Sequence, residues 1–203
     1  MRDYVTVVTG APRSGTSLMM RMLDAGGIPA LTDGHRPPDV HNPGGYFEYD
    51  PVKRLAEDSS WLEAARGRAV KVIYRLLPYL PERLDYRVVF MERDLEEVFE
   101  SQRVMLRARG DPAAGQHEDR LLPALAGELR NAREWLARRP GVRVLAAPYA
   151  GVVREPADWS RKVSGFLDGG LDEAAMAAAV DPTLYRQRGR GSPIPESSTK
   201  QRT

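Results

Sequence analysis

The sequence predicts an α/β fold of three layers, in which a parallel sheet of about four to five strands carries helices on both faces. Three observations support this prediction. Four short apolar segments are typical of buried strands, helical patterns separate them, and a glycine-rich loop joins the first strand to the first helix. Strands that alternate with helices indicate a parallel sheet packed between two helical layers.

The predicted elements follow one another regularly along the chain. We expect strands at Tyr4–Val8, Ala69–Ile73, Arg87–Met91 and Val142–Ala146. We expect helices at Gly15–Ala25, Val52–Ala65, Asp94–Arg109, Glu118–Arg138, Trp159–Leu167 and Asp172–Ala179. The third helix has a clear start, because Asp94 followed three residues later by Glu97 resembles a capping box with aspartate as the cap.

Length and composition favour one domain. A chain of 203 residues with 42% hydrophobic content can bury one core of ordinary size. We therefore expect a single α/β domain over residues 1–185. The remaining residues, 186–203, are rich in Gly, Ser, Pro and basic side chains, a composition that predicts a flexible tail.

The composition also excludes several classes of function. The chain has no cysteine, which rules out disulfides, thiol catalysis and zinc–thiolate sites, and three histidines offer little for a histidine-rich metal centre. A net charge of +2 does not fit a polybasic nucleic-acid binder. Because the chain lacks both a secretory signal pattern and an apolar run of roughly 20 residues, we expect a cytoplasmic protein without a membrane span.

The glycine-rich loop predicts an anion site. Gly10 and Gly15 keep the spacing of the phosphate loop G-x-x-x-x-G-K-[ST], which gives the fold its P-loop character. Thr16 stands where that loop has its lysine, and Arg13 brings a guanidinium into the loop. An arginine fork suits phosphate or sulfate oxygens. The sequence therefore predicts an anion site that works without the magnesium-triphosphate apparatus of nucleotide hydrolases.

Further cationic residues follow the ends of predicted strands. Lys71 lies in the second strand and Arg93 follows the third. Ligands of open α/β sheets bind outside the carboxyl ends of the strands, so we expect Lys71, Arg93 and the loop at one edge.

Three segments resemble the sulfotransferase superfamily. Gly10-Ala11-Pro12-Arg13-Ser14-Gly15-Thr16-Ser17 matches the family's loop G-x-P-R-S-G-T-[ST] throughout. Arg93 after a strand, with Ser101 eight positions later, reproduces the second signature. Asn42-Pro43-Gly44-Gly45-Tyr46-Phe47-Glu48 is similar to the N-P-x-G-Y-x-E stretch of many bacterial sulfotransferases. In this order and spacing, the three identify the chain as a member of the bacterial sulfotransferase family.

The resemblance implies a donor and the residues that bind it. The donor is 3′-phosphoadenosine 5′-phosphosulfate, the product is adenosine 3′,5′-bisphosphate, and no metal is required. Arg93 and Ser101 are implied to hold the 3′-phosphate, and Arg188 in the basic tail could close over it. The loop residues are implied to bind the 5′-phosphosulfate, namely Ala11, Pro12, Arg13, Ser14, Gly15, Thr16 and Ser17.

The resemblance also implies catalytic residues. Lys71 falls near the family's catalytic lysine and is assigned, with Arg13, to the leaving phosphate. The cytosolic branch has a histidine base two positions after that lysine, where this chain has Ile73. The base is therefore expected in the stretch after the first helix. Glu48, between aromatic residues that can partly desolvate it, ranks ahead of Asp33 there.

The histidines of the same stretch, His35 and His41, are better explained as solvated surface residues. The expected reaction moves a sulfuryl group to a hydroxyl or amine of a small molecule or saccharide. A small-metabolite kinase with a P-loop and a non-catalytic nucleotide-binding domain are the alternatives. The sequence predicts neither the identity of the acceptor nor the oligomeric state.

Overall fold

The computed structural model describes residues 2–35, 37–39, 42, 44–108, 110–111 and 118–184. Its sheet has four parallel strands in the order β2-β1-β3-β4. The strands are β1 (Val5–Gly10), β2 (Ala69–Lys71), β3 (Tyr86–Glu92) and β4 (Val142–Pro148). This architecture confirms the predicted parallel sheet, and each predicted strand matches an observed one within a few residues.

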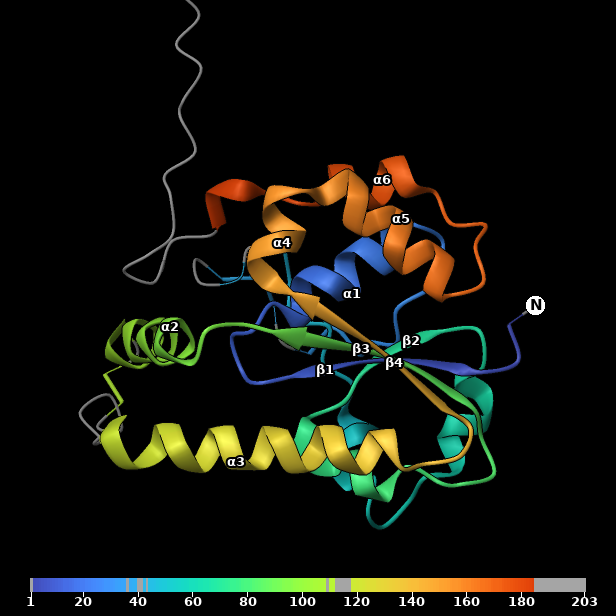
Figure 1. Cartoon of the computed structure of the whole chain (residues 1–203), viewed down its shortest axis with the longest axis horizontal. Coiled ribbons are helices and arrows are strands. Elements are labelled where there is room, and N and C mark those ends of the chain that lie inside the picture. The colour runs from blue at the N-terminus through green and yellow to red at the C-terminus, as the bar shows by residue number, and fades with distance from the viewer. Residues whose placement is uncertain are drawn as a thin grey trace, which may run out of the picture.

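Helices cover both faces of the sheet (Figure 1). One face carries α1 (Thr16–Ala25), α4 (Tyr149–Arg154), α5 (Pro156–Phe166) and α6 (Glu173–Ala178). The other carries α3 (Glu118–Ala137) and the 3₁₀ helices η1 (Asp50–Arg54), η2 (Ser60–Ala65) and η3 (Tyr74–Tyr79). A further short turn, η5, covers Pro182–Leu184. Helix α2 (Leu95–Ala108) lies beyond the end of β3, so it borders the carboxyl edge of the sheet.

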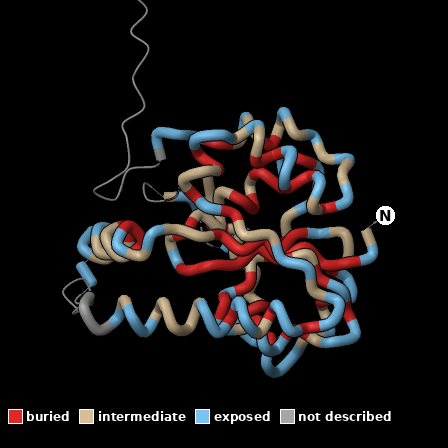
Figure 2. Tube along the Cα trace, in the orientation of Figure 1, coloured by how far each residue is buried: buried red, intermediate tan, exposed pale blue. Residues whose placement is uncertain are grey.

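Each face of the sheet builds its own hydrophobic core. Successive side chains of a strand point to opposite faces, and Val7 and Val8 accordingly belong to different clusters. The cluster that contains Val8 is the upper core in the view of Figure 1, and it joins the sheet to α1, α4, α5 and α6. The cluster that contains Val7 is the lower core, and it joins the sheet to α3 and the 3₁₀ helices. Figure 2 shows the buried residues concentrated along the strands and the helix faces that cover them.

The helix predicted at Val52–Ala65 is wrong, because two 3₁₀ helices and a turn occupy this range. Four apolar residues of the pattern, Val52, Leu55, Leu62 and Ala65, are nevertheless buried in the lower core. The helical ladder is interrupted between them, where the Asp58 carboxylate accepts the backbone N–H of Ser60 at 2.8 Å. A local side-chain bond of this kind competes with helical hydrogen bonding, and the chain restarts as η2.

The other predicted helices correspond to α1, α2, α3, α5 and α6. Helix α5 begins at Pro156 instead of Trp159, because proline suits the first helical position. Neither α4 nor η3 was predicted. Among the described residues, no helix combines the length and apolar character that crossing a bilayer requires. The tail predicted over residues 186–203 lies outside the described residues.

Candidate functional site

The glycine-rich loop turns the chain from the centre of the sheet into α1. Gly10 ends β1 with φ 147°, and a Cβ there would lie 2.5 Å from the carbonyl oxygen of Met91 on β3. Only glycine fits this close approach. Gly15 occupies the N-cap of α1 with φ 97° and offers no capping side chain. The first N–H groups of α1 therefore point into the loop, which is the geometry of an anion site.

One hydroxyl of the loop supports this interpretation. Ser14 is almost fully buried, and among the described residues its Oγ meets no hydrogen-bond partner. A buried polar group without a partner costs free energy unless a ligand or water satisfies it. An anion held by the loop would provide the missing acceptor.

The second signature is bonded directly to the first. The Nε of Arg13 donates to the hydroxyl of Ser101 on α2 at 3.0 Å, across a separation of 88 residues. In return, Nη1 of Arg93 donates to the carbonyl of Arg13 at 3.0 Å. The structure thus brings the loop, the arginine after β3 and the serine of α2 into one cluster at the carboxyl edge of the sheet.

Arg93 is held by a buried ion pair and an aromatic ring. Its Nε lies 3.0 Å from the carboxylate of Glu97, one turn into α2, and the two side chains are only 7% and 4% exposed. The Tyr149 ring, directly after β4, lies under the guanidinium at 4.5 Å. The same ring packs against Gly15, where a Cβ would lie 2.4 Å from it. Arg93 is therefore fixed from three elements.

Asp94 begins α2 as predicted, since its carboxylate accepts the N–H of Glu97 at 3.1 Å. Glu97 itself binds Arg93. The buried stripe of α2 includes Glu97 and Ser101 beside Val98. Charged side chains are seldom buried in a helix that only packs against a core, so their burial in α2 indicates a functional site.

Arg13 lies in a charged and partly desolvated place. Burial holds the pKa of its guanidinium below the ordinary value, and the positive charge of Arg93 acts in the same direction. Tyr46 and Asp39 act in the opposite direction. Because arginine starts so far above neutrality, the side chain stays charged.

The third motif lies against the loop through Tyr46. The carbonyl oxygen of Tyr46 accepts hydrogen bonds from Nζ of Lys71, at the end of β2, and from Oγ of Ser17 at 3.3 Å. The Tyr46 hydroxyl donates to Asp39 at 2.7 Å. Lys71 is therefore positioned between the end of its strand, the loop and the segment that carries Glu48.

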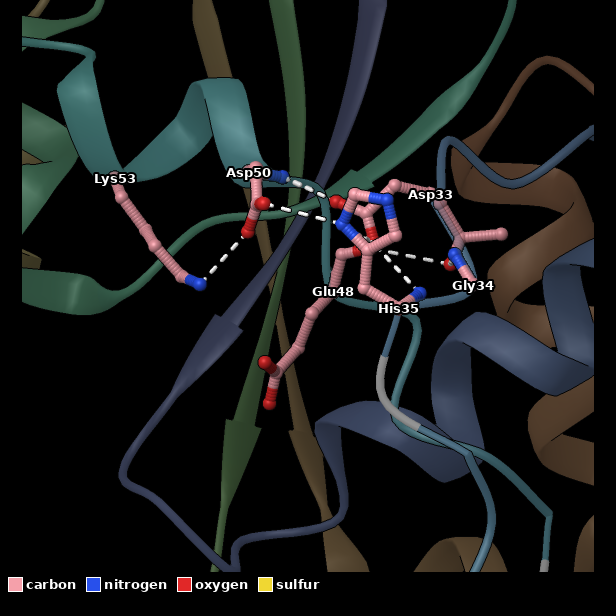
Figure 3. Close-up of polar contacts among 7 residues, drawn as sticks. Asp33, Gly34, His35, Glu48, Asp50 and Lys53 are labelled. Carbon is pink, nitrogen blue, oxygen red and sulfur yellow. Dashed lines mark hydrogen bonds and ion pairs between the residues drawn. The ribbon is translucent and has the colours of Figure 1, made fainter.

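Asp33 and Asp50 fasten the segment between α1 and η1 (Figure 3). The Asp33 carboxylate accepts the backbone N–H of His35 at 3.0 Å and that of Asp50 at 2.6 Å. These bonds hold the pKa of Asp33 below its usual value, the bond from His35 most of all. Lys53, at 2.7 Å, and His35 lower the pKa of the Asp50 carboxyl.

Asp33, His35 and Asp50 bring three atoms of metal-ligand type within 4.8 Å of one another. The hydrogen bonds above account for this cluster as the fastening of a turn. Figure 3 shows the Glu48 side chain pointing away from it. The backbone oxygen of Glu48 accepts from Thr32 and Asp33, both at 3.1 Å, so the segment holds Glu48 by its main chain.

The sulfotransferase domain of the olefin synthase of Synechococcus PCC 7002 matches 97% of this chain and 90% of its own length, with 18% identity and a TM-score of 0.52. The sulfotransferase domain of the curacin biosynthetic pathway matches 98% of this chain and 95% of its own, with 16% identity and the same TM-score. The chain has the sulfotransferase fold. No protein-family model and no curated protein matches the sequence.

Within the sulfotransferase fold of this chain, most residues singled out by the sequence gather at one edge. Lys71, Arg93 and the loop lie there, as the strand pattern predicted, and Ser101 of α2 lies beside them. Asp33 lies in the turn with Asp50. Arg188 and His41 fall outside the described residues.

Sequence reasoning missed three contributors to the cluster. Glu97 was noted only as a helix-start residue, although a glutamate one turn after an arginine is also a signal for an ion pair. No sequence pattern pointed to Asp39 or Tyr149 as site residues, because their positions depend on how distant segments pack.

Proposed function

We propose that this chain is a sulfotransferase that moves a sulfuryl group from 3′-phosphoadenosine 5′-phosphosulfate to a hydroxyl or amine of a small molecule or saccharide. The observation that carries the proposal is the contact between the two donor signatures. Arg13 of the loop bonds Ser101, and Arg93 bonds the backbone of Arg13. One ligand with phosphates at both its 5′ and 3′ positions could meet both signatures at once.

The chain's own groups fit such a donor. The uncapped start of α1 and the Ser14 hydroxyl offer hydrogen-bond donors to the 5′-phosphosulfate. Arg93 and Ser101 offer a guanidinium and a hydroxyl to the 3′-phosphate. The bound donor would supply the sulfuryl group and a phosphate that leaves when the sulfur–oxygen bond breaks.

Lys71 and Arg13 are assigned to the leaving phosphate. Positioning and charge stabilisation dominate the related phosphoryl transfers, and Lys71 is held within hydrogen-bonding distance of the carbonyl that Ser17 also contacts. Its ammonium would balance the negative charge that gathers on the leaving phosphate.

A base must take the proton of the acceptor, and Glu48 and Asp33 are the candidates. Both oxygens of Asp33 already accept backbone N–H groups, and its pKa is lowered, which makes it a weaker proton acceptor. The side chain of Glu48 points away from that turn. These facts favour Glu48 as the base and Asp33 as the residue that holds the segment.

Calorimetry without magnesium tests the proposal. We expect adenosine 3′,5′-bisphosphate to bind at least a hundredfold more tightly than ADP, a difference of about 2.7 kcal/mol. We also expect a chelator to leave this affinity unchanged. Equal or tighter binding of magnesium-ATP would contradict the proposal and favour a kinase. Tight binding of the bisphosphate with no sulfated product from any acceptor would favour a non-catalytic domain.

A further inference from the structure

The two outer strands of the sheet, β2 and β4, differ in what lies along their free edges. Beside β2, the N–H of Leu31 donates to the carbonyl of Ala69 at 2.7 Å, and the N–H of Ala69 donates to the carbonyl of Pro29 at 3.0 Å. Beside β4, the part of the chain that the structure describes offers only β3 as a pairing strand. Figure 1 shows β4 in front of the other strands, with no further element across it. The sheet therefore has one covered edge and one open edge.

Three residues of β4 turn their backbone hydrogen-bonding groups outward. The carbonyl of Gly141 accepts the N–H of Tyr86 on β3 at 2.8 Å, so across the trans peptide the N–H of Val142 points away from β3. The direction of these groups alternates from one residue to the next along a strand. The N–H and C=O groups of Val142, Val144 and Ala146 therefore face outward, and no described residue bonds them.

The open edge also lacks the features that keep edge strands from pairing. Such features are prolines, bulges, very short strands and charged side chains. Strand β4 has seven residues in unbroken pairing with β3, and its one proline, Pro148, is the last of them. Its one charged residue, Arg143, lies over the ring of Phe166 at 5.6 Å and pairs with Asp168 at 3.7 Å. Val144, in the middle of the strand, is 39% exposed. An apolar strand with a free edge is a surface that pairs with another strand.

The edge is complementary to a second copy of itself. The outward groups are centred on Val144, so a two-fold axis there places Val144 opposite its own copy and Val142 opposite Ala146 of the other chain. Residues that face each other in this way in an antiparallel pair exchange both N–H···O bonds, so every outward group finds a partner. The three side chains lie on one face of the strand and are aliphatic, so no like charges meet directly there.

The covered edge decides which kind of assembly can form. Pairing of β4 with β2 of another copy would be head-to-tail and would extend into an open filament. Residues 29–31 already occupy the edge of β2, which blocks this arrangement. Two copies can pair edge to edge only through β4 on both sides, and such a contact closes after two chains.

We propose that this chain forms a symmetric dimer in which the β4 strands of two copies pair antiparallel about Val144. The two four-stranded sheets then continue as one sheet of eight strands. The dimer goes beyond the proposed function and does not depend on it, because the contact uses the outer edge of β4 and none of the residues assigned to the donor or to catalysis.

Sedimentation equilibrium tests the dimer directly, and the wild-type chain should show twice the mass of one chain. Val144→Pro removes an outward N–H from each copy and keeps the hydrogen bonds between β3 and β4, since that N–H does not face β3. Val144→Lys sets two ammonium groups opposite each other across the axis. We expect each variant to raise the dissociation constant of the dimer at least tenfold.

Val104→Lys is the matched control. Val104 is 36% exposed, close to the value for Val144, but it lies on α2 beyond the end of β3. This variant should leave the dissociation constant unchanged. Thermal unfolding reports whether each variant is folded, and Val144→Lys carries the test if Val144→Pro does not fold.

Single cysteines test the position of the axis, because the natural chain has no cysteine. A short bismaleimide should join two copies of Val144→Cys into a covalent dimer and should leave Val104→Cys largely as single chains. A wild-type chain that stays monomeric overturns the proposal. A dimer that persists in both Val144→Pro and Val144→Lys overturns it as well, because the contact would then lie on another surface. Assemblies that keep growing with concentration would overturn the closed arrangement.

Discussion

The carboxyl edge of the sheet, where we propose that the donor binds, and residues 31–35 and 44–50 lie side by side but are held in different ways. At this edge, Arg93 and Ser101 are fixed by a buried ion pair and by contacts that span 80 and 88 residues of sequence. Residues 31–35 and 44–50 are held largely by hydrogen bonds among themselves, above all through the carboxylate of Asp33. The proposed donor site is thus built on the sheet, whereas the proposed base is carried by residues that are held mainly by hydrogen bonds among themselves.

The largest difference in the free energy of unfolding should come from replacing one glycine with positive φ in each of the two regions. Gly10→Ala places a Cβ 2.5 Å from the backbone oxygen of Met91, which cannot move without breaking the sheet. We expect it to cost about 3 kcal/mol or more of the free energy of unfolding. Gly34→Ala has φ 70° and open space around it, so about 1 kcal/mol is expected. Urea denaturation measures both, and equal costs would contradict the contrast.

The next contrast concerns the ion pairs. Glu97→Ala leaves Arg93 buried without its anion and should cost about 3 kcal/mol in urea denaturation. Asp50→Ala removes a partner of Lys53 that is 49% exposed, and little change in stability is expected. The double variant Glu97→Leu, Arg93→Met should recover much of the loss. A double variant as unstable as Glu97→Ala would show that the cost lies elsewhere.

The same contrast explains what the sequence could predict. Strand positions and the convergence of Lys71, Arg93 and the loop follow from apolar runs and from the rule that parallel strands end at one edge. The glycine spacing around Arg13 predicted the loop between β1 and α1. These features depend on local pattern and on one general rule of sheet topology.

The features that the sequence did not predict depend on side chains whose partners are distant in the sequence, or on side chains that compete with backbone hydrogen bonds. Asp58 interrupts the predicted helix by accepting a hydrogen bond from the backbone N–H of Ser60. The hydrophobic pattern of a sequence carries no information about such a bond. Tyr149 finds Arg93 only because β4 lies beside β3. The hydrogen bonds that occupy Asp33 likewise require the turn to be formed first.

Measurements of kcat should distinguish the two regions through variants that leave the stability of the fold unchanged. Glu48→Gln should lower kcat at least a hundredfold, the usual contribution of a general base, while the affinity for adenosine 3′,5′-bisphosphate stays within twofold. Asp33→Asn serves as the control, because it keeps the shape of the side chain in the turn. If Asp33→Asn lowers kcat more than Glu48→Gln does, the base has been assigned to the wrong carboxylate.

The smallest effect is a pH dependence confined to the segment. The folded pKa values of Asp33 and Asp50 lie below their ordinary value of 3.8, so these carboxylates contribute stability above that pH. The contribution is lost as pH falls through the lowered values. We expect the amide resonances of His35 and Asp50 to shift below pH 3.8. A midpoint above 3.8 would contradict the sign of this coupling.

The strand order has a consequence for how the protein is made. Strand β1 and its loop leave the ribosome before the other strands, yet β1 lies between β2 and β3, and Arg13 contacts Ser101, which is made 88 residues later. Contacts of such long sequence separation form late, because a long stretch of chain must close before they form. A nascent chain that ends before α2 therefore carries the whole loop but lacks Ser101 and with it part of the proposed donor site. Capture of adenosine 3′,5′-bisphosphate by nascent chains of increasing length would report the point at which this proposed site has formed.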